Sequence, residues 1–61
     1  MAQITEKELS ALGDLMSMEG VLCAKCHDMA NCTQDAALKD QYTQMAQRHQ
    51  RHFDELFSNL K

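Results

Sequence analysis

Three residues near the middle of this 61-residue chain carry side chains that could bind a metal ion: Glu19, His49 and His52. Glu19 is the only charged member of a series of core-type residues at helical spacing that extends from Leu9 to Ala30. A buried carboxylate without a partner is strongly unfavourable, so it requires a cation, a protonated imidazole or a metal ion. His49 and His52 are three residues apart and therefore project from one face of a helix, as the ligands of metal-binding helix bundles do.

These donors predict a transition-metal site, and the sequence leaves its identity open. Carboxylate oxygen and imidazole nitrogen suit zinc, iron, manganese or copper, and we expect zinc or iron first. The alternative is a hydrogen-bonded ion pair between Glu19 and His49 that fixes the register of the helices without a metal. Glu55 follows at the edge of the histidine face, where it could support His52 from outside the ligand set.

A second group of donors comprises three cysteines and one histidine: Cys23, Cys26, His27 and Cys32. Cys23 and Cys26 continue the apolar series, where reduced cysteine commonly packs as a small hydrophobic residue. The Cys-x-x-Cys-His segment with a third thiol after it also suits a soft metal such as Cu(I). The segment matches the haem-attachment motif too, but both cysteines lie on the core face, so we do not expect haem.

Two helices are needed to position these residues. Thr5 followed by Glu8 is a capping-box signature, which predicts the start of the first helix. Polar residues then interrupt the apolar pattern, and Asp35 is placed to cap a second helix, in which the two histidines occupy positions typical of leucine. We therefore predict a single all-α domain with helices over about 5–31 and 36–60 and a turn over about 32–35.

The short turn predicts an antiparallel hairpin, because helices joined by short loops pack against each other. Folding about residues 33 and 34 places Glu19 opposite His49, and Met16 opposite His52. The apolar faces are wide enough to contact a second hairpin as well as each other. We therefore predict that two copies form a four-helix bundle, in which a two-fold axis brings two sets of Glu19, His49 and His52 together.

The size and charge of the chain argue against several classes of function. A chain of 61 residues buries only about 60% of its unfolded surface, so it needs a metal, a cross-link or a partner copy. The net charge of −3 offers no basic surface for nucleic acid or for an acidic membrane. The first residues lack a secretory signal and no apolar segment approaches the ~20 residues of a membrane span, so we expect a cytosolic protein with reduced thiols.

Several segments together carry a family resemblance over nearly the whole chain: Ile4–Leu9, Asp14–Leu15, Glu19, Asp35–Lys39 and Ala46–Phe53. They resemble small spore coat F-like proteins of the ferritin-like, rubrerythrin-like superfamily. The resemblance implies a half-bundle that dimerises into a ferritin-like four-helix bundle, with the spore coat as a further location and coat proteins as partners. In ferritin-like di-iron enzymes one helix supplies a glutamate and the next supplies Glu-x-x-His. Glu19 and His52 match the first glutamate and the histidine, whereas His49 stands where the second glutamate would be.

We therefore expect a metal-binding homodimer, with a structural coat or interaction protein as the alternative. In the alternative the polar core is free of metal and the cysteines form cross-links, for which Cys32 in the turn is the best-exposed thiol. We expect a binding protein rather than an enzyme, and the donors leave a di-iron oxidase or peroxidase activity open. No serine or cysteine has an evident base and orienting group, so a hydrolase is not expected.

Overall fold

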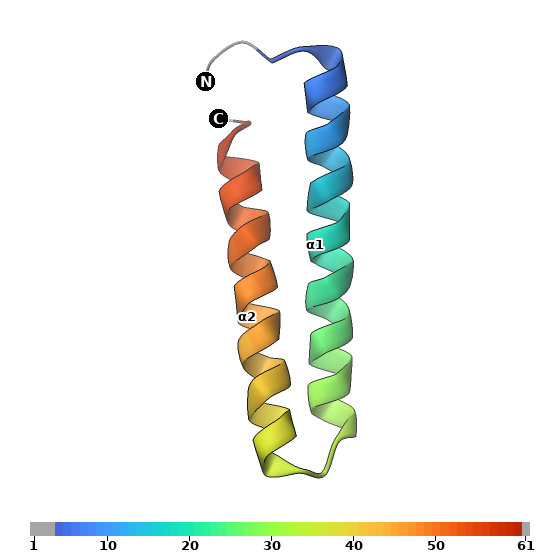
Figure 1. Ribbon diagram of the computed structural model, residues 1–61, viewed down its shortest axis with the longest axis vertical. Helices are drawn as coiled ribbons and strands as arrows, with labels where there is room; N and C mark the ends of the chain where they lie inside the picture. Colours follow the sequence, from blue (N-terminus) through green and yellow to red (C-terminus); the bar gives the residue numbers. More distant parts are fainter. Residues whose placement is uncertain (1–3, 61) are drawn as a thin grey trace.

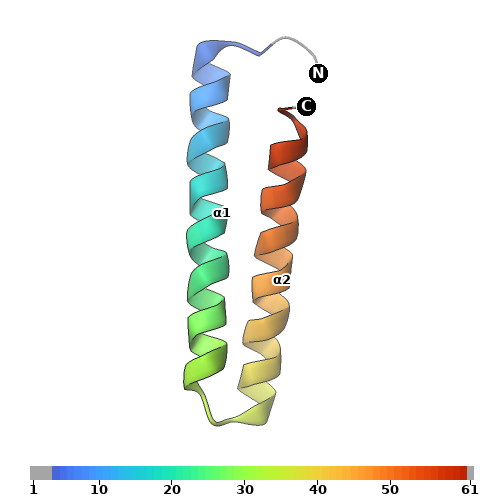
Figure 2. The ribbon, with the colours of Figure 1, turned by 180° about the vertical axis from the view of Figure 1, so that it is seen from behind.

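The computed structural model describes residues 4–60, which form an antiparallel hairpin of two α-helices (Figure 1). Helix α1 spans Glu6–Cys32 and helix α2 spans Ala36–Ser58. The two helices lie side by side, and the view from behind shows the same arrangement (Figure 2). The hairpin measures 47 × 15 × 10 Å, so it is a single layer about one helix thick. Within residues 4–60 there is no strand, and neither helix is long and apolar enough to cross a membrane.

Side-chain caps fix where each helix begins. The Thr5 hydroxyl accepts a hydrogen bond from the backbone N–H of Glu8 at 3.1 Å, and the Glu8 carboxylate accepts one from the backbone N–H of Thr5 at 3.2 Å. This is the predicted capping box, which satisfies N–H groups that have no partner within the helix. The Asp35 carboxylate caps α2 in the same way by accepting from the N–H of Leu38 at 3.0 Å.

The turn between the helices is short because the caps at its two ends almost adjoin. Thr33 takes an extended backbone conformation and ends α1, and its N–H donates to the Met29 carbonyl at 3.1 Å. The Thr33 hydroxyl then accepts from the N–H of Asp35, which opens α2. The predicted helix boundaries at 5–31 and 36–60 agree with the observed ones to within two residues.

The contact between the helices is formed by small side chains. Cys23 and Cys26 of α1 are 8% and 7% exposed, and Ala46 of α2, which belongs to the same cluster, is completely buried. Ala30 is the remaining buried residue among those described. Small side chains allow two helix backbones to approach closely, so this contact sets the register that brings residues of the two helices together.

The hairpin leaves most of its large apolar side chains exposed to solvent. Among residues 4–60, ten of them are exposed, including Leu15, Leu22 and Met45. An apolar face of this kind normally packs against another element. The predicted all-α hairpin is confirmed. The predicted four-helix bundle needs a second copy of the chain, so it stays a prediction.

Candidate metal centre

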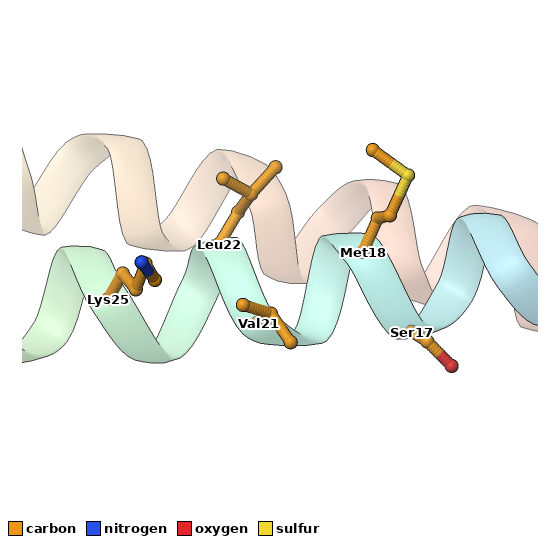
Figure 3. A pocket seen from close by; sticks show the side chains of 5 residues that line it. All are labelled: Ser17, Met18, Val21, Leu22 and Lys25. Atoms are coloured by element: carbon orange, nitrogen blue, oxygen red, sulfur yellow. The ribbon is translucent and has the colours of Figure 1, made fainter.

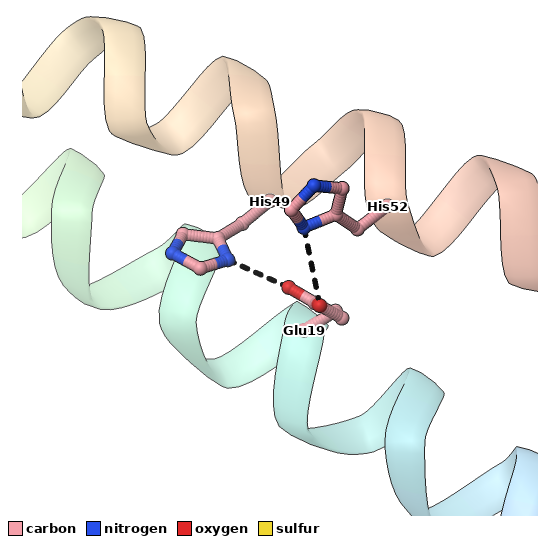
Figure 4. A group of neighbouring side chains, drawn as sticks. All are labelled: Glu19, His49 and His52. Carbon is pink, nitrogen blue, oxygen red and sulfur yellow. Dashed lines mark hydrogen bonds and ion pairs between the residues drawn. The ribbon is translucent and has the colours of Figure 1, made fainter.

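Glu19 and the two histidines come together across the hairpin at mid-height. Glu19 is the fourteenth of the 27 residues of α1, and His49 is the fourteenth of the 23 residues of α2. His49 Nδ1 lies 2.6 Å from Glu19 Oε1, and His52 Nδ1 lies 3.3 Å from Glu19 Oε2 (Figure 4). The predicted pairing of Glu19 with His49 is therefore confirmed. His52 was expected opposite Met16, but its ring reaches Glu19, about one helical turn further along α1.

The three side chains are partly accessible to solvent. Glu19 and His49 are each 21% exposed and His52 is 43% exposed. The single hairpin therefore gives a half-open site. Partial exposure leaves an ion a path into the site.

The hydrogen bond to Glu19 assigns a proton to one nitrogen of the His49 imidazole. An ionised carboxylate can only accept, so the nitrogen that meets it must carry a hydrogen. A neutral His49 ring then has its hydrogen on Nδ1 and its lone pair on Nε2. No hydrogen bond between residues 4–60 reaches Nε2 of either ring, and Figure 4 shows both Nε2 atoms on the far sides of their rings from Glu19.

The histidines also act on the charge state of the glutamate. The hydrogen bond from His49 is the largest cause that lowers the pKa of the Glu19 carboxyl from its usual value of 4.5. Desolvation raises this pKa by less, and the electrostatic attraction and weaker hydrogen bond of His52 lower it further. Glu19 is therefore an anion at neutral pH, which is the form that binds a metal.

The spacing of the donors fits one metal ion after a small adjustment. One donor atom from each of Glu19, His49 and His52 can be chosen so that all lie within 4.8 Å of one another. Two ligands of a tetrahedral zinc ion are about 3.3 Å apart, given metal–ligand distances of about 2.0–2.1 Å. The 3.3 Å between His52 Nδ1 and Glu19 Oε2 matches this spacing, whereas the 2.6 Å between His49 Nδ1 and Glu19 Oε1 is the distance of a hydrogen bond. A metal that binds both atoms would replace the proton of that hydrogen bond and widen the contact.

The rings are arranged so that both can contribute without stacking. Their centroids are 5.8 Å apart and their planes meet at 86°. The shared carboxylate holds them in these orientations, as a carboxylate behind a metal-bound histidine commonly does. Glu19 can thus act as a ligand itself, in which case the metal replaces the proton at Nδ1, or it can keep its hydrogen bond and position a ring that binds through Nε2.

The structure does not bring the cysteine group together as it does Glu19 and the histidines. Among residues 4–60, the Glu19, His49 and His52 cluster is the only set of three such donors within ligand range of one another. Cys23 and Cys26 are buried between the helices, and the Cys23 thiol points to Gln50 Oε1 at 3.8 Å. All three cysteines are free thiols. Cys32 was predicted to lie exposed in the turn; it is exposed, but it is the last residue of α1. Soft-metal binding by Cys23, Cys26, His27 and Cys32 stays a prediction.

A shallow groove beside the candidate centre was not foreseen from the sequence. It is lined by Leu15, Glu19, His52, Glu55, Leu56 and Asn59. Glu55 therefore shares a groove with His52, as suggested, although no hydrogen bond joins the two side chains. The seven-residue spacing between His52 and Asn59 is the sequence signal that could have indicated this groove.

Comparison with protein-family models, curated proteins and solved structures found no match for this chain.

Proposed function

We propose that this chain is a metal-binding protein that works as a homodimeric, ferritin-like four-helix bundle, with a transition-metal site formed by Glu19, His49 and His52. The observation that supports the proposal most directly is the contact of one carboxylate with two imidazoles from the neighbouring helix, at 2.6 and 3.3 Å. A bundle that needed only a fixed register would be served by the first contact alone.

The donor set favours zinc or iron, and copper is also compatible with it. Two imidazoles and one carboxylate are the protein ligands of several catalytic zinc sites and of the non-haem iron(II) facial triad. Three protein ligands leave positions open for water or for a further ligand. Metal binding would also stabilise a hairpin with so few buried residues, because it favours the folded state.

The proposal is tested by metal content. The untagged protein is purified with reduced thiols, reconstituted with Zn(II) or anaerobic Fe(II), desalted and measured by elemental analysis. We expect metal to be retained by the wild type, lost from Glu19→Ala and His52→Ala, and retained by His27→Ala, a matched change at an exposed histidine outside the cluster. Absence of metal from the reconstituted wild type would contradict the proposal, and so would equal retention by Glu19→Ala.

The second candidate function is a structural spore-coat or interaction protein. Two observations favour it: both Glu19 oxygens already have partners without a metal, and the exposed Cys32 thiol is placed for an intermolecular disulfide. Mass analysis under non-reducing conditions after mild oxidation would then show a disulfide-linked dimer that disappears in Cys32→Ser. A chain that stays monomeric in this assay would contradict the cross-linking role.

A further inference from the structure

The hairpin exposes more surface than a compact monomer of its mass. Its accessible surface is 4798 Å², whereas the scaling law for compact monomers gives about 4000 Å² for 6.9 kDa. Its radius of gyration is 14.4 Å, against about 10.5 Å for a compact chain of this length. The excess of roughly 800 Å² equals the area that each partner buries in a standard protein–protein interface.

The exposed apolar residues lie in two series with the same repeat. Leu15, Leu22 and Met29 are seven residues apart along α1, and Leu38, Met45 and His52 are seven residues apart along α2. Because seven residues make nearly two helical turns, each series stays on one side of its helix. In the antiparallel hairpin each step of seven along α1 corresponds to a step of seven back along α2. We call the surface made by these six residues the ladder face.

A shared groove, together with the seven-residue repeat, places both series on the same side of the hairpin. Leu15 and His52 line the same groove beside the candidate centre. Figure 3 shows Leu22 projecting from α1 to the same side as Met18, in a shallow apolar depression. The five apolar members of the ladder face are between 39% and 49% exposed. The ladder face is therefore apolar over most of its length, with His52 as its polar member.

The other side of the hairpin differs in composition. Its groove is lined by Gly20, Cys23, Ala24, His27, Gln50 and Phe53. The large exposed apolar residues are absent from this lining, and Cys23 is already buried against α2. The ladder face is thus the side on which water contact with apolar surface is most unfavourable.

We infer that a second copy of this chain docks on the ladder face, ladder face to ladder face, and thereby brings the two Glu19, His49 and His52 clusters to the same height. The inference deepens the proposed function by naming the surface that completes the bundle, and its statement about the site rests on that function. A two-fold interface requires one self-complementary patch, and the ladder face is apolar at each level except that of His52. A second layer 10 Å thick would turn the flat hairpin into a bundle.

The position of the candidate centre on the hairpin lets the two sites meet across the dimer interface. Glu19 is at the midpoint of α1 and His49 is close to the midpoint of α2. Two hairpins that stack ladder face to ladder face with their turns at the same end therefore align their sites at the same height. Because His52 belongs to the ladder face, its ring would lie against the partner and its Nε2 atom would be available there.

The test measures association of the untagged, reduced, metal-free protein by sedimentation equilibrium. We expect a dimer, and we expect Met45→Lys on the ladder face to raise the dissociation constant by at least about tenfold, as for loss of a central interface contact. The matched control, Ala24→Lys in the opposite groove, should leave the dissociation constant unchanged. A monomeric wild type, or a dimer that Ala24→Lys disrupts and Met45→Lys does not, would overturn the inference.

A second measurement uses the wild-type chain, so it does not depend on the folding of any variant. In a dimer of mixed isotope labelling, filtered NOE spectra report contacts between copies. We expect contacts from the methyl groups of Leu22 and Met45 and from the His52 ring, whereas contacts from the Ala24 methyl instead would contradict the proposed face. If these contacts are found but no metal binds, the proposed function fails and the dimer surface stands. If metal binds to a monomer, the metal site of the proposed function stands, whereas the dimer and the ladder-face interface are wrong.

Discussion

Replacing Ala46 with leucine tests whether close approach of the two helices holds the candidate centre together. Ala46 is the one fully buried residue among those described, it packs with Cys23 and Cys26, and it lies one helical turn before His49. The larger side chain has no space there, and overpacking of this kind costs about 1–3 kcal/mol. For domains of about 60–100 residues each kcal/mol lowers Tm by roughly 4–8 °C, so we expect Tm to fall by at least about 4 °C.

The assay is thermal unfolding followed by circular dichroism, at one fixed protein concentration because a dimer is stabilised by mass action. Ala24→Leu is the matched control, since it makes the same substitution at an exposed position of α1. We expect this control to change the free energy of unfolding by no more than about 0.5 kcal/mol. Zn(II) binding should also weaken in Ala46→Leu, because separating the helices lengthens the contact between Glu19 and His49. Equal Tm values for the two leucine variants would refute this account of the helix contact.

Three further predictions concern the helix cap at Thr5, the loss of stability at acid pH and the cysteines. Thr5→Ala removes the capping box and should lower the free energy of unfolding by about 1 kcal/mol in urea titrations, with no change in metal affinity. The lowered pKa of Glu19 stabilises the folded state above pH 4.5, and this stabilisation is lost as the pH falls through the folded-state pKa. Glu19→Gln should therefore lose less stability than the wild type between about pH 5 and 2. Urea unfolding across that pH range measures the difference. Cys26→Ser places a hydroxyl in the buried helix contact and should cost about 1–3 kcal/mol, whereas exposed Cys32→Ser should change stability by less than about 0.5 kcal/mol. If both serine variants keep the metal stoichiometry of the wild type, these two thiols are not ligands of the bound metal.

Much of the fold follows from local chemistry that is visible in the sequence. The Thr5 and Glu8 pair and the Asp35 cap are short-range signals, and each acts in the structure as its residue types require. The meeting of Glu19 with His49 was also predictable, because a short turn fixes the antiparallel register and the helical repeat carries that register to mid-height.

The finer geometry of the site depends on side-chain reach that spacing does not encode. A level-by-level pairing assigns His52 to Met16, yet the long Glu19 side chain offers one oxygen to each ring and so reaches two levels of α2. Which imidazole nitrogen faces the carboxylate is decided by side-chain rotamers, so the sequence could not show that Nε2 is the outward atom. Which apolar residues lie in the helix contact and which lie on the ladder face likewise depends on the face of α1 against which α2 packs.

Titration with Co(II), a spectroscopic substitute for Zn(II), tests the metal-binding claim most directly. We expect saturable visible d–d bands typical of nitrogen and oxygen ligands, without thiolate-to-cobalt charge-transfer bands, and loss of the d–d bands in Glu19→Ala. Charge-transfer bands that vanish in Cys23→Ser would assign the metal to the cysteine group instead. A flat titration of the wild-type protein would contradict metal binding by this chain.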